Sequence, residues 1–282
     1  MERTDILLLA VNAALAAGKR ILEIYNQPQE SWQVEQKADH SPLTLADRQA
    51  NDIIVKALSP VGIPVLSEET RLTDYQERSR WQQLWIVDPL DGTKEFIKRN
   101  GEFTVNIALV EQGSPVFGVV YAPAQGKLYV GRCGQGAWRL EVDADTVLPD
   151  WSAVLENGRS LPLDGRSLPL EPDAASGTKT RIVVSRSHLD EHTLQFIARL
   201  EAEGRQVETV ASGSSLKICL LAEGSADLYP RFAPTSEWDT AAGDGVLRAV
   251  GGVLHEVETG APLRYNKENI LNPFFMGGAA QE

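Results

Sequence analysis

Two short apolar runs in the chain each end directly in acidic residues. Residues 63–66 end at Ser67-Glu68-Glu69, and residues 84–87 end at Asp88 in the string Asp88-Pro-Leu-Asp91-Gly-Thr93. Short apolar runs bounded by polar residues are typical of buried strands. Strands of α/β folds carry such side chains to the end of the sheet, where the sites of these folds commonly lie. The pattern therefore predicts a sheet with a group of carboxylates at one end.

The first half of the chain predicts a mixed α+β arrangement. Apolar residues recur at helical spacing over residues 5–25. Thr44 followed by Asp47 has the pattern of a capping box, which predicts a second helix from Thr44 to about Leu58. Residues 103–132 are strand-like and interrupted by Gly and Pro, which favours an antiparallel meander.

The second half predicts a different arrangement after a stretch of weak pattern. Residues 142–180 are rich in Pro, Gly, Ser and Asp, and we interpret them as an extended surface insertion. Strands expected at 181–185, 206–211, 226–230 and 252–257 then alternate with helices at 189–203, at 214–223 and from about 238, which is typical of α/β. We therefore expect an N-terminal half (1–141), the insertion (142–180) and a C-terminal half (181–282).

The charge and the apolar pattern exclude several classes of partner. The formal net charge of -12 argues against a nucleic-acid polymer and against docking on an anionic membrane by charge alone. The most apolar stretch, residues 6–17, is too short and too interrupted for a transmembrane segment. The two cysteines, Cys133 and Cys219, lie far apart, which favours a reducing, cytoplasmic compartment. A small anionic substrate remains compatible with these observations.

The string from Asp88 to Thr93 has two interpretations. Taken alone it is a common turn, because Pro presets φ, Asp bonds to its own backbone and Gly supplies positive φ. A further acid, Asp239, opens a late helix, and Gly92-Thr93 offers consecutive N–H groups that suit a phosphate at a helix start. These features together favour a phosphate site beside several acids.

Hard divalent cations prefer carboxylate and carbonyl oxygens, and two such ions can stabilise both the attacking and the leaving oxygen of a phosphoryl transfer. Carboxylates that converge without a cation repel each other, so some would be protonated. The residues therefore predict a metal site, with oxygen ligands from Glu68, Asp88, Asp91, Asp239 and the carbonyl of Leu90.

Four blocks of the sequence resemble the inositol monophosphatase-like family of lithium-sensitive, magnesium-dependent phosphatases. They are Ser41-Pro-Leu-Thr-Leu-Ala-Asp47, Leu66-Ser-Glu-Glu69, Asp88 to Thr93, and Trp238-Asp-Thr-Ala-Ala-Gly243. The resemblance covers about residues 5–273 and is strongest to the CysQ-type 3'(2'),5'-bisphosphate nucleotidases. It implies a layered α-β-α-β-α sandwich, two or three Mg²⁺ ions, and a cytoplasmic location with peripheral association at the inner membrane, as in bacterial relatives.

The resemblance also implies a role for each matching residue. Glu68, Asp88, Leu90, Asp91 and Asp239 match metal ligands. Glu68 and Thr93 match the pair that orients and activates the attacking water, supported by Asp47. The implied substrate contacts are Glu68, Leu90, Asp91, Gly92, Thr93, Ser185, His188, Ser215, Lys217, Arg231 and Asp239.

Simpler interpretations of some of these residues stay open. Asp47 and Asp239 also suit helix N-termini as capping residues. Lys217 and Arg231 could be solvated surface charges. His188 and His192, four residues apart, could form a zinc pair, although no third ligand is evident. Glycines at 131, 134 and 136 have the wrong order for a dinucleotide fingerprint and indicate turns.

The resemblance implies removal of the 3'-phosphate from adenosine 3',5'-bisphosphate, giving AMP and phosphate. It extends to 3'-phosphoadenosine 5'-phosphosulfate as a second substrate and to a link with sulfate assimilation. One alternative is an inositol monophosphatase with the same metal site and a smaller, charge-poor pocket. Another is a non-catalytic nucleotide or metal sensor, against which the set Asp47, Glu68 and Thr93 argues. The sequence leaves the oligomeric state and the substrate preference open.

Overall fold

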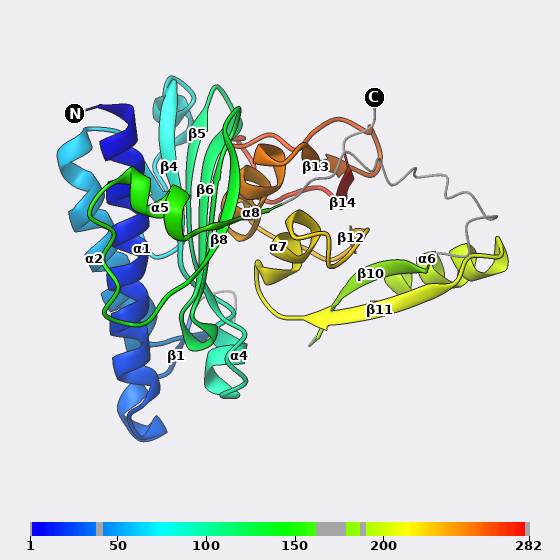
Figure 1. The fold of residues 1–282 in the computed structure, drawn as a ribbon, viewed down its shortest axis with the longest axis horizontal. Helices are drawn as coiled ribbons and strands as arrows, with labels where there is room; N and C mark the ends of the chain where they lie inside the picture. The colour runs from blue at the N-terminus through cyan, green and yellow to red at the C-terminus, as the bar shows by residue number, and fades with distance from the viewer. Residues whose placement is uncertain (1, 38–41, 162–178, 187–189, 280–282) are drawn as a thin grey trace.

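A seven-stranded sheet forms the centre of the computed structural model, which describes residues 2–37, 42–161, 179–186 and 190–279 (Figure 1). Its strands lie in chain order, and only the first pair, β3 with β4, is parallel. The strands are β3 (Val65–Ser67), β4 (Gln83–Asp91), β5 (Thr104–Glu111), β6 (Ser114–Ala122), β7 (Lys127–Arg132), β8 (Gly136–Glu141) and β9 (Arg159–Ser160).

Helices cover both faces of this sheet. On one face α1 (Arg3–Tyr25) and α2 (Leu45–Leu58) pack together, and α5 (Trp151–Asn157) lies on the same face. These helices surround a core that includes Ile21, Trp85 and Phe117. On the other face lie α7 (Leu216–Ala222) and α8 (Glu237–Ala249), around a second core that includes Val246. The sheet therefore has one apolar core on each side, which is why β4 to β7 are almost continuously buried.

Two smaller sheets and a helix complete the layers. Strands β10 (Thr180–Ser185) and β11 (Val207–Ser212) are parallel, and α6 (Glu191–Ala202) packs against them through Leu200. Strands β12 (Tyr229–Arg231), β14 (Phe275–Ala279) and β13 (Gly252–Glu256) form an antiparallel sheet in that order. The predicted α-β-α-β-α sandwich is confirmed (Figure 1). The short elements are β1 (Glu35–Gln36), β2 (Pro42–Leu43), α3 (Tyr75–Arg78), α4 (Thr93–Ile97) and 3₁₀ turns at Gln29–Trp32, Ser59–Val61 and Pro123–Gln125.

Most of the expected elements are confirmed, and three differ. The strand expected to end at Asp88 continues to Asp91, because pairing with β5 resumes opposite Thr104 after a register shift. Strand β14 was not predicted, since its two glycines argue against a strand. The second half is α/β only around β10, α6 and β11, because β12 to β14 are antiparallel.

The stretch expected to be an extended insertion is partly folded onto the first half. Residues 142–161 contain α5 and β9, and Leu148 and Val154 are buried in the core under α1. Residues 162–178 lie outside the described residues. The division of the chain into three parts stays a prediction. In the described part of the chain, none of the helices has the length and apolarity that crossing a membrane requires.

Glycines set how closely α8 approaches the sheet. A Cβ on Gly118 of β6 would lie 2.0 Å from the carbonyl oxygen of Ala242. A Cβ on Gly131 of β7 would lie 2.4 Å from the Cα of Val246. The backbone of α8 therefore rests directly on β6 and β7, and this contact holds the first turn of α8 beside the end of β4.

Candidate active site

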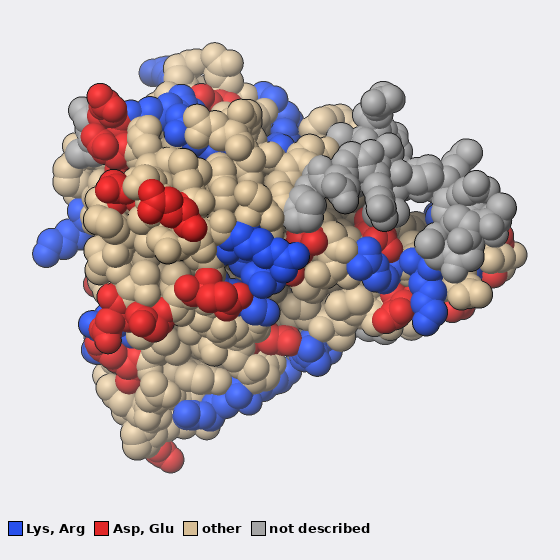
Figure 2. Space-filling model, in the orientation of Figure 1, with Lys and Arg blue, Asp and Glu red and all other residues tan. Residues whose placement is uncertain are grey.

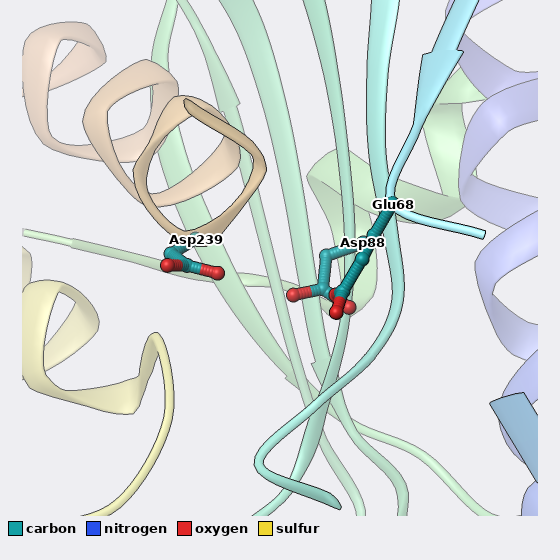
Figure 3. A group of neighbouring side chains, drawn as sticks. All are labelled: Glu68, Asp88 and Asp239. Carbon is teal, nitrogen blue, oxygen red and sulfur yellow. The ribbon is translucent and has the colours of Figure 1, made fainter. Parts of the chain in front are cut away.

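Three carboxylates from separate elements meet at the end of the large sheet. Glu68 follows β3, Asp88 lies in β4 and Asp239 lies in the first turn of α8. Each offers an oxygen, and these oxygens all lie within 4.8 Å of one another. Figure 3 shows Glu68 and Asp88 side by side, with the carboxylate of Asp239 facing them from α8. The sequence prediction that these three acids converge is therefore confirmed.

Local hydrogen bonds hold two of these acids. The Leu90 N–H donates to Asp88 Oδ1 at 3.0 Å, within the turn-like end of β4. The Ser236 N–H donates to Asp239 Oδ2 at 2.8 Å. Asp239 is thus not the N-cap but the third residue of α8, in a capping box whose N-cap is Ser236. The helix start itself orients this acid.

Burial and mutual repulsion make the cluster difficult to ionise. Burial raises the pKa of Asp88 well above its ordinary value, and Glu68, Asp91 and Asp239 add to that shift by repulsion. Burial, with repulsion from Asp91, raises the pKa of Asp239 to about 8. Burial likewise raises the pKa of Glu68 and of Asp91. A group of oxygens with this charge has the chemistry of a divalent-cation site.

Lys37 supplies a positive charge to this group that the sequence did not indicate. Its Nζ donates to Glu68 Oε1 at 2.6 Å and also to Glu69. Burial lowers the pKa of Lys37, but the two carboxylates outweigh burial and raise it above its ordinary value. No local pattern marks Lys37, because its partners are about thirty residues away in the chain.

Asp47 makes the hydrogen bonds expected from both interpretations of this residue, one at the start of α2 and one to Thr93. Its Oδ2 accepts from the Thr44 N–H at 2.7 Å, which caps α2, and its Oδ1 accepts from Thr93 Oγ1 at 3.0 Å. Asp47 is 1% exposed. Thr93 is the first residue of α4, after Gly92 at φ +91°, so the predicted helix start at Gly92-Thr93 is confirmed. One buried carboxylate therefore caps a helix and orients a hydroxyl of the site.

Asp91 lies beside the cluster and contacts the C-terminal half. The Ser215 hydroxyl lies 2.7 Å from Asp91 Oδ2 and 2.8 Å from the Asp239 carbonyl oxygen, and it accepts from Asn106 Nδ2 at 2.8 Å. Asn106 lies in β5, opposite Asp88 of β4. The sequence analysis missed Asn106, although an amide inside a buried strand was a signal that could have indicated it.

A cavity of about 150 Å³ adjoins the carboxylates. Lys217 is 8% exposed, so it is not a solvated surface charge. Its Nζ donates to the Ser214 carbonyl at 2.6 Å, and burial lowers its pKa to about 8. Arg231 Nε and Ser214 Oγ are buried and have no hydrogen-bond partner among the described residues. The lining residues are Asp91, Gly92, Glu95, Ser185, Gly213, Ser214, Ser215, Lys217, Ile218, Tyr229, Arg231, Thr235, Asp239 and Thr240.

The two predictions that involve His188 concern a residue that the structure does not describe. His188 lies outside the described residues, so neither its predicted substrate contact nor the zinc pair with His192 is described. The ring of His192 lies beside those of Phe232 and Phe274. The glycines at 131, 134 and 136 lie in and around the β7–β8 turn, as expected.

The chain is similar to known proteins over most of its length. The model of the inositol monophosphatase family matches residues 2–274. The 3'(2'),5'-bisphosphate nucleotidase CysQ of Shigella flexneri is 43% identical, covering 92% of this chain and 94% of the relative, and that of Haemophilus influenzae is 30% identical, covering 93% and 88%. The crystal structure of CysQ from Bacteroides thetaiotaomicron superposes with a TM-score of 0.86 at 46% identity, covering 99% of each chain. The chain therefore belongs to the inositol monophosphatase family.

Proposed function

We propose that this protein is a Mg²⁺-dependent 3'(2'),5'-bisphosphate nucleotidase that converts adenosine 3',5'-bisphosphate to AMP and phosphate. The similarity to CysQ proteins over nine-tenths of the chain supports the reaction class. The observation that carries the substrate choice is the cavity, which Asp91 and Asp239 line together with Lys217 and Arg231. A substrate with two phosphates needs cations at a distance from the metal site, and this cavity offers them.

The donor set fits a hard divalent cation. Glu68, Asp88 and Asp239 bring oxygens within 4.8 Å of one another, and burial with repulsion raises their pKa values. We propose that these residues, with Asp91 and the Leu90 carbonyl, hold two or three Mg²⁺ ions. Bound Mg²⁺ would lower the pKa of a water molecule and neutralise charge on the phosphate.

The neighbouring side chains then orient the water and the phosphate. Because Thr93 Oγ1 donates its proton to Asp47, its lone pairs remain available to accept a hydrogen bond from the attacking water. We propose Glu68 as the carboxylate that takes up the proton of that water. The backbone N–H groups of Gly92 and Thr93, at the start of α4, are proposed to bind the reacting phosphate.

Initial rates of phosphate release with Mg²⁺ test the proposal. We expect a higher kcat/KM for adenosine 3',5'-bisphosphate than for inositol 1-phosphate, and loss of both activities with excess EDTA. A clear preference for inositol 1-phosphate would favour the monophosphatase alternative. No phosphate release from either substrate with Mg²⁺ would favour a sensor.

Further properties implied by the family resemblance belong to the same proposal. They are hydrolysis of 3'-phosphoadenosine 5'-phosphosulfate, a link to sulfate assimilation, inhibition by lithium and a cytoplasmic location with peripheral membrane association. Release of phosphate from the sulfated nucleotide, measured with and without lithium, tests two of them directly.

A further inference from the structure

Glu102 links the turn after α4 to the ends of β10 and β11 beside the cavity. It lies in the turn between α4 and β5, and its carboxylate accepts from Arg186 Nε at 2.6 Å and from Arg186 Nη2 at 2.7 Å. The same carboxylate accepts from the Gly213 N–H at 2.8 Å. Arg186 follows β10 and Gly213 follows β11, so one side chain holds the ends of both parallel strands.

The backbone around this contact is shaped for close approach. Arg99 and Gly101 have φ of 57° and 76°, and the Glu102 N–H donates to Asn100 Oδ1 at 2.9 Å, so the turn is tightly folded. A Cβ on Gly213 would lie 2.9 Å from both Cβ and the carbonyl oxygen of Glu102. A residue other than glycine at 213 would therefore push this loop away from Glu102.

The loop held by Glu102 carries two contacts of the proposed site. The Ser214 carbonyl accepts from Lys217 Nζ at 2.6 Å. The Ser215 hydroxyl lies 2.7 Å from Asp91 Oδ2. The position of the loop 213–215 therefore determines where the buried ammonium lies relative to the carboxylates, although Glu102 itself is not among the residues lining the cavity.

The contact is stronger than an ordinary surface ion pair. The side chain of Glu102 is 16% exposed, whereas that of Arg186 is 46% exposed. Exposed ion pairs contribute little, but a bidentate Arg–carboxylate pair with an added backbone N–H is both stronger and geometrically specific. Arg186 Nη2 also donates to the Ala211 carbonyl at 2.9 Å, which fixes the guanidinium against β11.

We propose that Glu102 is a positioning residue that, through Arg186 and the Gly213 N–H, holds the loop 213–215 and thereby sets the preference for substrates with a second phosphate. The part of this inference that concerns substrates rests on the proposed function. The part that concerns the loop does not, because it depends only on the contacts of Glu102.

Kinetics of Glu102→Ala on two nucleotides test the selectivity. We expect the KM for adenosine 3',5'-bisphosphate to rise about tenfold, the size expected if a displaced loop weakens one charge-assisted contact between Lys217 and the substrate, with kcat changed less than about twofold. The KM for 3'-AMP, which lacks the 5'-phosphate, should change less than about twofold. Glu102→Gln should lie in between, because its amide oxygen can still accept from Gly213. Glu203→Ala, which removes an exposed ion-pairing carboxylate directly after α6, is the matched control.

Amide hydrogen exchange of the Mg²⁺-loaded protein without substrate tests the loop. Faster exchange of the amides at 213–217 in Glu102→Ala, with unchanged exchange in α2, supports the inference. Unchanged exchange at 213–217, or an equal rise in KM for both nucleotides, would overturn it. A wild-type protein inactive on adenosine 3',5'-bisphosphate would refute the proposed function and the selectivity with it, while the exchange result would still decide the role of Glu102 in the loop.

Discussion

The carboxylate side and the cation side of the proposed site are built differently. Glu68, Asp88 and Asp239 come from the seven-stranded sheet and from a helix that rests on it with backbone contacts. Lys217 comes from α7, a short helix beside α8, and Arg231 comes from β12, a three-residue strand of a smaller sheet. Both regions pack into apolar cores, but the charged groups of the second also depend on polar contacts of loops, such as those that Glu102 makes.

This difference suggests a division of roles. Like charges that repel one another need a rigid support if they are to converge, and a continuous sheet with a close-packed helix provides it. The cations bind carbonyl oxygens of loops, Ser214 for Lys217 and Pro234 for Arg231, so their positions follow the loops. Changes on the carboxylate side should therefore affect every substrate, and changes on the cation side should depend on the substrate.

Replacing Asp91 by Asn should have the largest effect. Loss of this charge next to Asp239 should lower kcat/KM by about 10²–10³ on both adenosine 3',5'-bisphosphate and 3'-AMP, as removal of an electrostatic catalytic group does. Exposed Asp52→Asn on α2 is the control and should match the wild type. Retention of more than about a tenth of the activity would contradict a metal role for Asp91.

Gly118→Ala should disturb the carboxylate side indirectly, through the contact between β6 and α8. Because the new Cβ would lie 2.0 Å from the Ala242 carbonyl, α8 must shift, and overpacking of this kind costs about 1–3 kcal/mol of unfolding free energy. Activity should fall on both substrates, since Asp239 moves with α8. Gly204→Ala, where a Cβ meets no atom within 4 Å, controls for strain at positive φ and should cost about 1 kcal/mol without changing KM. A loss of stability with unchanged activity would contradict the claim that the packing of α8 on the sheet positions Asp239.

Lys217→Met should affect one nucleotide much more than the other, unlike the two changes on the carboxylate side. It keeps the buried volume but removes the charge, so the KM for adenosine 3',5'-bisphosphate should rise about tenfold while that for 3'-AMP changes little. Lys56→Met, an exposed residue of α2, is the matched control. An equal rise in KM for the two nucleotides would show that Lys217 acts on every substrate, as the carboxylates do, and would contradict the division of roles between the two sides.

The last prediction concerns how the stability of the metal-free protein depends on pH. The pKa of Asp239 is raised to about 8, so the folded state holds a proton that the unfolded chain releases near pH 4. Its contribution is therefore complete below pH 4 and is lost as pH rises through about 8. Melting temperatures in EDTA should fall over this interval, and Mg²⁺ should reduce the fall. Asp239→Asn should flatten the profile, and an unchanged slope would show that other groups cause it.

Much of the carboxylate side was predictable because its signals are local. Thr44 with Asp47 forms the predicted capping box, and Gly92-Thr93 begins a helix as expected. Lys37 and Glu102 could not be assigned in this way. Glu102 binds Arg186, 84 residues further along the chain, and no spacing in the sequence marks that contact.

The sequence by itself determined the acidic turn from Asp88 to Thr93 and the approximate starts of the long helices. It also determined the four motifs that resemble a phosphatase family. Capping, turn chemistry and apolar periodicity act over a few residues, so they can be recognised without the fold. Only the tertiary structure decided that Asp239 lies near Asp88, that Lys217 is buried and that Glu102 binds Arg186 and Gly213. The position of Asp239 depends on how closely α8 rests on Gly118 and Gly131, a packing distance that results from the whole core, and the other two depend on contacts between residues far apart in the chain.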